Sequence, residues 1–404
     1  MSKNDFIERS FYTQKIAPYV DKPIIKIMTG QRRVGKSYIL KQTIDFIKQN
    51  VTDANVIYVN KEEKAFKEII TDDDLYTYLS ERLLVDKKNY VFIDEIQEIS
   101  NFQNTLRSLF AEQRCDIYCT GSNANMLSGE LATYLAGRYI EIPIHGLSYL
   151  EFLQFHQLED SNQNIIKFMR IGGMPYLINL KGDEELSYEY LRNLYSTILL
   201  KDVINRKQIR NIDFMERLVK YIADNIGSLF SANNISKYLK SQRQQLPTQM
   251  VIDYSLALAQ AFFIYKVSRT DLQGLKYFEI GEKYYFEDLG LRNAIVGFDP
   301  LSDIGKWMEN VVYIHLSRLG YEVSVGKIND LEIDFVAKKL DRGKYYQVCF
   351  RFDSIETQQR EINSLLNQKD NFPKYIITLD EFAVGQTKEG ISIISLNDFL
   401  LNEE

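Results

Sequence analysis

Apolar runs of strand length alternate with segments of helical periodicity through residues 1–147. The helical segments include 38–48 and 101–113, in which apolar residues recur at intervals of three and four. This alternation predicts an α/β fold, with a parallel sheet covered by helices on both faces. The expected strands are Ile24–Met28, Val56–Val59, Tyr90–Asp94, Asp116–Thr120 and Tyr139–Ile142.

Residues 148–227 keep the helical periodicity but lose the strand signal. We expect a helical lid or linker here, interrupted by a turn at the sequence Gly-Gly-Met-Pro of residues 172–175. The expected helices are Leu150–Gln157, Asn164–Arg170, Leu186–Asn205 and Ile212–Asn225.

Residues 228–297 predict a short helix, a polar turn, a second helix that begins at Thr248, and a β-ribbon. This is the element order of a winged helix. Residues 298–404 predict a third domain, an α/β unit with a mixed sheet. The ribbon strands are 262–267, 276–280 and 283–286; the third domain has helices 307–319 and 357–368 and strands 321–325, 332–337, 344–350, 375–378 and 391–394.

A chain of 404 residues is too long for one core, so several domains are expected. The net charge of −6 excludes a uniformly basic coat for nucleic acid. No apolar run approaches the ~20 residues of a membrane span, and the N-terminus lacks a secretory core segment. Three cysteines and three scattered histidines provide neither a disulfide framework nor a metal cluster. These features favour a reducing cytoplasm.

The sequence from Gly30 to Ser37 matches the phosphate-binding pattern G-x-x-x-x-G-K-[ST]. A predicted strand precedes it and a predicted helix follows it, which is the context that a P-loop needs. Gly30 and Gly35 let backbone N–H groups point inward at a polyphosphate. Lys36 is then expected to bind the β- and γ-phosphates of ATP, and Ser37 to hold Mg²⁺.

A second motif supports this interpretation. The buried strand 90–94 ends in two carboxylates, Asp94 and Glu95. At the carboxyl end of a parallel strand, Asp94 would lie beside the P-loop and complete the Mg²⁺ site. Glu95 could then act as the general base for the attacking water. Together the two motifs predict an ATPase that uses ATP and Mg²⁺.

Residues 201–250 hold nine Lys and Arg but only four Asp and Glu. A local excess of positive charge in an acidic chain is a candidate surface for DNA. Winged helices also serve as protein-docking modules, and charged helix faces are commonly just solvated. Both interpretations stay open at this point.

The P-loop sequence Thr-Gly-Gln-Arg-Arg-Val-Gly-Lys-Ser and the later Phe-Ile-Asp-Glu-Ile-Gln resemble the archaeal-type AAA+ ATPase family. Further motifs agree with this resemblance over nearly the whole chain. They are typical of the prokaryotic group that carries the C-terminal region DUF4143. The motifs are Thr120–Asn123, Leu135–Tyr139, Leu147–Phe152, Gly172–Pro175 and Tyr285–Arg292.

The resemblance implies further roles. Ser122 or Asn123 would sense the γ-phosphate at the end of the fourth strand. Arg138 would act as an arginine finger on the nucleotide of a neighbouring subunit, which implies a homo-oligomer, possibly a hexamer. The alternative is that Arg138 only caps a turn or pairs with an acid.

The last domain resembles a PD-(D/E)XK nuclease core, with Glu309 on its helix and Asp334 on a strand. The next strand has Gln347 and Cys349 where such a site needs an acid and a lysine. A neutral amide and a thiol are poor partners for Mg²⁺. We therefore expect a nuclease-like fold without nuclease activity.

Three functions are compatible with these features. The first is an oligomeric AAA+ ATPase that couples ATP hydrolysis to binding or remodelling of DNA. The second is a regulatory nucleotide switch that docks a protein through its winged-helix and C-terminal domains. The third, supported by the fewest features, is an active endonuclease with an ATPase motor.

Overall fold

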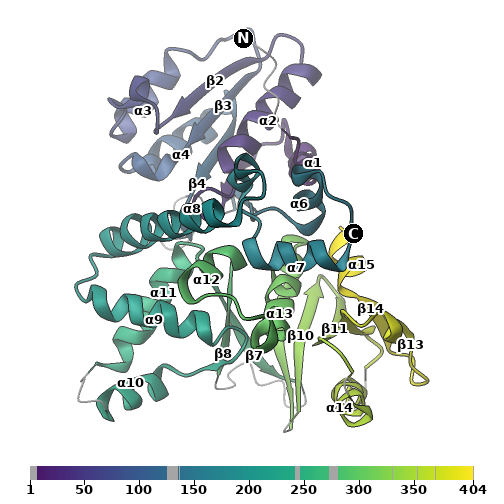
Figure 1. Ribbon diagram of the computed structural model, residues 1–404. Helices are drawn as coiled ribbons and strands as arrows, with labels where there is room; N and C mark the ends of the chain where they lie inside the picture. The colour runs from purple at the N-terminus through teal and green to yellow at the C-terminus, as the bar shows by residue number, and fades with distance from the viewer. Residues whose placement is uncertain are drawn as a thin grey trace. The chain divides into compact units, whose positions relative to one another are not determined.

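The computed structural model describes residues 7–124, 135, 137–241, 246–272, 281–329, 331–352, 354–368 and 370–403 (Figure 1). The chain divides into two compact units. The first comprises Met1–His145 with Gln260–Phe262, and the second comprises Gly146–Ala259 with Phe263–Glu404.

The first unit contains a five-stranded sheet in the order β2-β3-β4-β1-β5, and every pair in it is parallel. The strands are β1 (Ile25–Thr29), β2 (Asn55–Asn60), β3 (Asn89–Asp94), β4 (Cys115–Gly121) and β5 (Tyr139–Pro143). All five predicted strands and their parallel arrangement are confirmed. β1 and β3 are buried along their whole length, as expected for parallel strands that are covered on both faces.

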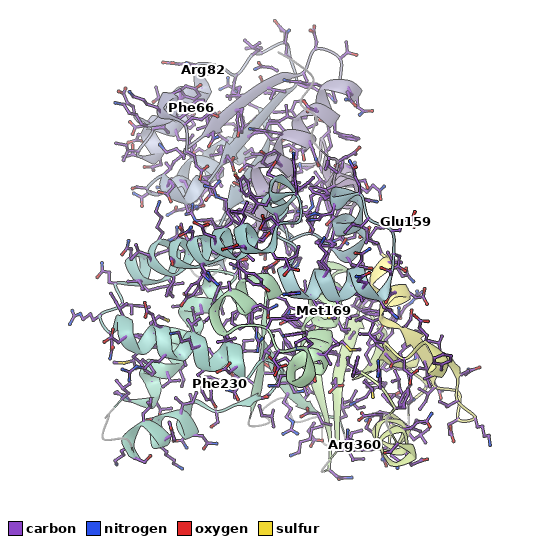
Figure 2. All side chains as sticks on the ribbon, in the orientation of Figure 1. Phe66, Arg82, Glu159, Met169, Phe230 and Arg360 are labelled. Atoms are coloured by element: carbon purple, nitrogen blue, oxygen red, sulfur yellow. The ribbon has the colours of Figure 1, made fainter. Side chains whose placement is uncertain are left out.

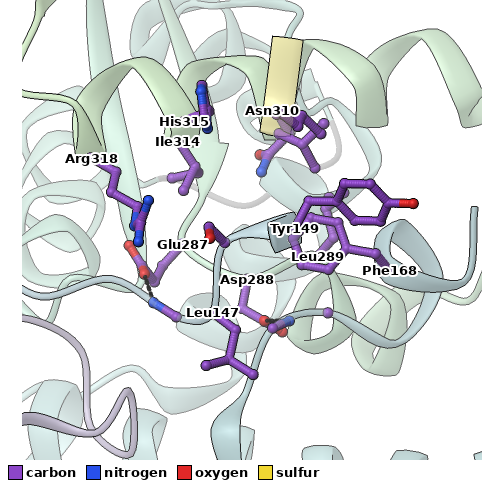
Figure 3. A pocket seen from close by; sticks show the side chains of 16 residues that line it. Leu147, Tyr149, Phe168, Glu287, Asp288, Leu289, Asn310, Ile314, His315 and Arg318 are labelled. Atoms are coloured by element: carbon purple, nitrogen blue, oxygen red, sulfur yellow. Dashed lines mark hydrogen bonds between the residues drawn. The ribbon is translucent and has the colours of Figure 1, made fainter. Parts of the chain in front are cut away.

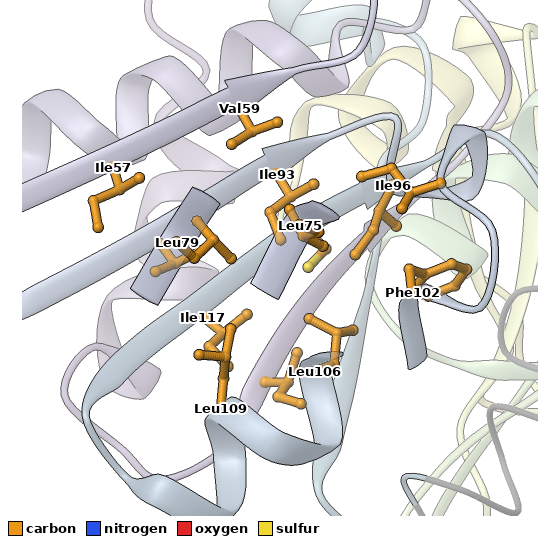
Figure 4. Close-up of a cluster of buried hydrophobic side chains, with 14 of the residues drawn as sticks. Ile57, Val59, Leu75, Leu79, Ile93, Ile96, Phe102, Leu106, Leu109 and Ile117 are labelled. Carbon is orange, nitrogen blue, oxygen red and sulfur yellow. The ribbon is translucent and has the colours of Figure 1, made fainter. Parts of the chain in front are cut away.

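Helices pack against both faces of the sheet, because successive side chains along each strand point to opposite faces. One face carries a buried cluster formed with α3 (Asp72–Ser80) and α4 (Phe102–Glu112); it includes Ile57, Leu75, Ile93 and Leu106 (Figure 4). Helix α2 (Lys36–Asn50) contacts β3 and β4 without contributing to this cluster. It therefore covers the other face, which confirms the predicted layers.

Short elements complete the first unit. The first helix, α1 (Ser10–Ile16), contacts α2. A capping box at Thr71 begins α3, in which the Thr71 hydroxyl and the Asp74 carboxylate exchange hydrogen bonds with each other's backbone N–H. The single-turn helices are η1 (Ala17–Tyr19), η2 (Lys64–Phe66) and η3 (Ile96–Glu98).

The second unit begins with helices, as predicted. Helix α8 continues without a break into a π-helical segment, η6. The two together correspond to the single long helix that the sequence predicted over Leu186–Asn205. Met169 on α7 is buried, whereas Glu159 in the preceding loop is exposed (Figure 2). The elements are α6 (Tyr149–His156), α7 (Asn162–Ile171), η5 (Pro175–Leu180), α8 (Glu184–Thr197), η6 (Ile198–Asn205) and α9 (Ile212–Asp224).

A short strand, β6 (Leu229–Phe230), two helices and a hairpin come next. The helices are α10 (Ala232–Ser241) and α11 (Thr248–Gln260). In the hairpin, β7 (Ile264–Asp271) and β8 (Glu282–Phe286) are antiparallel, and β8 also pairs with β6. The predicted strand 276–280 lies outside the described residues, as do residues 242–245 of the predicted turn.

The remaining strands extend the hairpin into a nine-stranded mixed sheet, in the order β13-β14-β12-β11-β10-β9-β7-β8-β6. A parallel pair between β7 and β9 makes the junction, and the sequence did not predict it. The other elements are α12 (Leu289–Val296), α13 (Pro300–Arg318), β9 (Glu322–Ile328), β10 (Leu331–Lys339), β11 (Arg342–Cys349), α14 (Ile355–Leu366), β12 (Lys374–Thr378), η7 (Glu381–Ala383), β13 (Gly385–Gln386), β14 (Ser392–Ser395) and α15 (Leu396–Leu401). The mixed sheet expected from residue 298 onward is confirmed.

Three expectations from composition can be compared with the described residues. None of the helices described is both long and apolar enough to cross a bilayer. Cys119 and Cys349 are buried free thiols, and Cys115 is half-buried. No group of three or more His, Cys, Asp or Glu in the described part of the chain could hold a metal ion.

Candidate nucleotide-binding site

The P-loop joins the carboxyl end of β1 to the first turn of α2. Gly30 and Gly35 both have left-handed backbone, with φ of 149° and 102°. A Cβ on Gly30 would lie 2.1 Å from the carbonyl oxygen of Ile144, so only glycine fits there. Residue 36 begins α2 directly after this turn. The loop therefore places the N-terminus of a helix, with its backbone N–H groups, where a phosphate can bind.

Lys36 is almost completely buried in the loop. Its ammonium donates hydrogen bonds to the carbonyl oxygens of Gly30 and Gln31, both at 3.0 Å. The same nitrogen lies 3.8 Å from Oε1 of Glu95. The cation of the P-loop is thus held at the carboxylates that end β3.

Asp94 lies at the carboxyl end of β3, as predicted, beside Ser37. The Ser37 side chain is hydrogen-bonded to Asp94, and Thr120 donates to Oδ1 of Asp94 at 2.5 Å. The Tyr58 hydroxyl donates to its other oxygen at 3.2 Å. Burial raises the pKa of Asp94 although these hydrogen bonds act against it. A bound cation would lower this pKa, because it adds positive charge beside the carboxylate.

Glu95 follows Asp94 with left-handed backbone, at φ 55°, and its N–H donates to the Thr120 hydroxyl at 2.9 Å. Burial by itself raises the pKa of the Glu95 carboxyl. The nearby Lys36 ammonium and a hydrogen bond from Gln97 outweigh burial, so that this pKa lies below its usual value. The carboxylate is therefore ionised at neutral pH, as a general base must be.

Ser122 and Asn123 follow β4, and both are buried at the same edge of the sheet. Ser122 Oγ donates to Oε2 of Glu95 at 3.2 Å. The structure therefore brings together the predicted residues Gly30, Gly35, Lys36, Ser37, Asp94, Glu95 and Ser122.

Arg138 does not join this group. It directly precedes β5, and its carbonyl oxygen accepts the N–H of Ile25, the first residue of β1. It is therefore at the amino edge of the sheet, whereas the P-loop is at the carboxyl edge. The five residues of β1 separate the two edges by about 16 Å at ~3.3 Å per residue. The Arg138 guanidinium lies over the ring of Phe110, 5.7 Å from its centroid.

Sequence reasoning missed four residues of this site. Thr120 and Gln97 bond to the carboxylates, and the buried Arg9 donates to the carbonyl oxygens of Val34 (2.8 Å) and His145 (3.0 Å). Gln31 is fully buried, and its carboxamide has no hydrogen-bond partner among the described residues. Thr120 and Arg9 act through contacts between residues far apart in the sequence, which no local pattern shows. Gln97 is close to Glu95 in the sequence and ends the motif Phe-Ile-Asp-Glu-Ile-Gln, but the motif gives it no role. Gln31 lies in the P-loop motif, at a position that this motif leaves undefined.

The C-terminal acids meet at a different place, within the second unit. Lys283 Nζ, from β8, lies 3.4 Å from Oε2 of Glu309, 2.8 Å from Oε1 of Glu332 and 3.9 Å from Oδ1 of Asp334. The Gln347 carboxamide accepts the N–H of Asp334 at 3.3 Å. A buried ammonium from the chain itself therefore lies among these carboxyl groups.

The second unit also contains a small pocket of about 40 Å³, where two of the later sequence motifs meet (Figure 3). Glu287 accepts the N–H of Gly146 at 2.8 Å, and Asp288 accepts that of Gly173 at 2.7 Å. A Cβ on Gly172 would lie 2.4 Å from the Asp288 carboxylate. The cavity has room for little more than a water molecule or two, so the motifs Gly172–Pro175 and Tyr285–Arg292 meet in a packing contact.

The basic residues of segment 201–250 are mostly at the surface of the second unit. Lys237 and Lys240 are exposed on α10, and Arg217 and Lys220 are exposed on α9. Arg243 lies outside the described residues.

Comparison with known proteins agrees with the P-loop geometry. The protein-family model described as an AAA domain matches residues 22–153. An uncharacterized protein of Haemophilus influenzae is 34% identical over 401 residues, which cover 98% of each chain. The chain belongs to this family of AAA-domain proteins.

Two further similarities of this AAA-domain protein are more distant. An uncharacterized protein of Methanocaldococcus jannaschii is 27% identical over 395 residues, 93% of this chain and 85% of that one. The solved structure of the replication initiator DnaA bound to AMPPCP and single-stranded DNA is 16% identical. That alignment covers 63% of this chain and 93% of DnaA, with a TM-score of 0.33. After the AAA domain, the matching model is a domain of unknown function, DUF8612, over residues 162–302, where the sequence resemblance predicted DUF4143.

Proposed function

We propose that this AAA-domain protein is an oligomeric ATPase that couples ATP binding and hydrolysis to binding or remodelling of DNA. The observation that supports hydrolysis is the convergence of Lys36, Ser37, Asp94 and Glu95 at one edge of a parallel sheet. Lys36 supplies a cation for the β- and γ-phosphates, and the backbone N–H groups at the start of α2 supply further donors.

The same residues fit Mg²⁺. The Ser37 hydroxyl and the Asp94 carboxylate are adjacent oxygen ligands, which suits an ion that keeps several waters of its own. When bound, Mg²⁺ supplies charge that neutralises the phosphate oxygens. The unpartnered Gln31 carboxamide and the space that Gly30 keeps free of a side chain agree with a loop shaped for a polar ligand.

Arg138 is proposed as an arginine finger that acts between subunits, since it lies at the sheet edge opposite its own P-loop. We expect Arg138→Ala to lower kcat by about 10³-fold or more and to leave ATP affinity unchanged, because the guanidinium stabilises charge in the transition state. Exposed Arg107→Ala on α4 is the matched control. Steady-state phosphate release and equilibrium nucleotide binding measure the two quantities.

Mixing Arg138→Ala with Lys36→Ala protein should restore part of the activity. The mixed oligomer contains interfaces at which an intact P-loop meets an intact arginine. Full activity of Arg138→Ala alone, or of a monomer at working concentration, would contradict action in trans.

The proposed action on DNA rests on the second unit. The element order α9, β6, α10, α11, β7, β8, with β6 paired to β8, supports a winged helix. The exposed lysines and arginines of α9 and α10 supply charge for phosphate contacts.

DNA binding is tested by fluorescence anisotropy with single-stranded, duplex and branched DNA at several salt concentrations. We expect Lys237→Ala/Lys240→Ala to weaken binding to DNA of every sequence. The slope of the logarithm of the binding constant against the logarithm of the salt concentration should become shallower by about one for each lost phosphate contact. The control is Lys64→Ala/Lys67→Ala, an exposed pair of the same spacing in the first unit. The proposal that the protein acts on DNA would be contradicted if the parent did not bind DNA. It would also be contradicted if Lys237→Ala/Lys240→Ala bound DNA as tightly as the parent.

One observation favours the second candidate, a nucleotide switch that docks a protein. Helix α11 takes the position of a recognition helix but contains no lysine or arginine. Its exposed face carries Ile252 and Leu256, 44% and 52% exposed, together with Asp253. A recognition helix that enters DNA usually has donors for bases and phosphates. Loss of partner binding, but not of DNA binding, in Ile252→Ser/Leu256→Ser would favour this candidate.

For the tail, the order α13, β9, β10, β11, α14, β12 supports the proposed nuclease-like fold. Lys283 lies among the acids that would have to bind a metal, and Gln347 and Cys349 replace an acid and a lysine. These features support a tail without nuclease activity and disfavour the endonuclease candidate.

A further inference from the structure

Two donors converge on one oxygen of the Glu95 carboxylate. Both the Gln97 carboxamide nitrogen and the Ser122 hydroxyl donate to Oε2, the latter at 3.2 Å. The same Gln97 nitrogen lies 3.3 Å from Ser122 Oγ, so the three side chains form a closed group. The other oxygen, Oε1, is the one that faces the Lys36 ammonium at 3.8 Å.

The orientation of the Gln97 carboxamide follows from its surroundings. If its oxygen and nitrogen were exchanged, the oxygen would face the Glu95 carboxylate, which is also an acceptor. The nitrogen must therefore point at Glu95. The Gln97 oxygen is buried and has no hydrogen-bond partner among the described residues.

The two oxygens of Glu95 consequently differ. Hydrogen bonds from two donors make Oε2 the less basic oxygen and fix the plane of the carboxylate. Oε1 accepts neither of these bonds, and it faces the cation that the proposed function places against the γ-phosphate. A water molecule that attacks this phosphate would therefore meet Oε1.

We infer that Gln97 is a positioning residue for ATP hydrolysis: with Ser122 it holds Oε2 of Glu95, so that Oε1 is the oxygen that takes the proton of the attacking water. This inference rests on the proposed ATPase function. It also means that Ser122 acts through Glu95 and not only as a phosphate sensor.

In the step itself, the water oxygen forms a bond to the γ-phosphorus while the bond from that phosphorus to the bridging oxygen of ADP breaks. The bridging oxygen leaves with the electron pair. The proton of the water moves to Oε1 and is later released to solvent. Gln97 and Ser122 take no part in bond making; they keep Oε1 within reach of the water.

A double-mutant cycle tests this inference. We expect Gln97→Met, which keeps the side-chain length but removes the N–H donors, to lower kcat by about 10- to 100-fold, the worth of a hydrogen bond to a charged group. MgATP affinity should stay at the parental value. In a Glu95→Gln background, Gln97→Met should lower kcat no further, because Gln97 acts only through the carboxylate. Half-buried Gln103→Met on α4 is the matched control.

The possible results separate the hypotheses. If the parent protein hydrolyses no ATP, the proposed function fails. If it does, but Gln97→Met keeps the parental kcat or is equally harmful in both backgrounds, the inference about Gln97 is overturned. If Gln97→Met does not fold, Ser122→Ala removes the second donor to the same oxygen and completes the same cycle. An additive effect there would overturn the inference as well.

Discussion

Glu95→Gln is expected to bind MgATP at least as tightly as the parent and to hydrolyse it about 10²- to 10⁴-fold more slowly. The amide has nearly the same shape, but it cannot accept the proton of the attacking water. Affinity is retained because the change removes a negative charge near the phosphates. The parent carboxyl is ionised at neutral pH and can accept a proton, because the adjacent Lys36 and Gln97 outweigh burial and hold its pKa below the usual value.

The measurement is single-turnover hydrolysis alongside equilibrium nucleotide binding. Glu98→Gln, an exposed glutamate three residues later, is the matched control and should keep parental turnover. An unchanged rate in Glu95→Gln would show that another group is the base.

Lys36→Ala is expected to lose about 10- to 100-fold in affinity for MgATP, and turnover with it. The basis is that a hydrogen bond between charged groups contributes roughly 1.5–3 kcal/mol. The same substitution leaves the carbonyl oxygens of Gly30 and Gln31 without their buried donor, which loosens the loop. Both effects act on binding, in contrast to Glu95→Gln, which acts on the chemical step.

Isothermal titration calorimetry with ATP, ADP and Mg²⁺ checks this result. Exposed Lys48→Ala, in the last turn of the same helix, is the control for loss of a positive charge on α2. Parental affinity in Lys36→Ala would contradict the assignment of the P-loop.

The parts of the site that could be predicted are those that a short stretch of sequence determines. The turn Gly30–Ser37 needs glycine where the backbone is left-handed and where it comes close to Ile144. The apolar residues of β3 are followed by the acidic residue Asp94, which marks the end of the strand in the sequence. Such constraints leave a visible pattern of residue types.

The missed parts depend on contacts between distant residues. Thr120 meets Asp94 only because β3 and β4 are neighbours, and Lys283 meets Glu309 and Asp334 only because the β7–β8 hairpin joins the sheet of the tail. Thr120 belongs to the motif Thr120–Asn123, but nothing in that motif indicates Asp94 as its partner, and Lys283 belongs to none of the motifs. The sequence accordingly predicted most of the described strands of the second unit, but not the short strands β6 and β13 or the junction between β7 and β9.

Whether this site hydrolyses ATP is decided by measuring phosphate release from saturating MgATP by the purified protein. We expect steady turnover by the parent, a rate reduced by at least about 10²-fold in Glu95→Gln, and unchanged nucleotide affinity in that variant. No phosphate release by the parent, or the same rate in parent and variant, would contradict the claim that this site hydrolyses ATP.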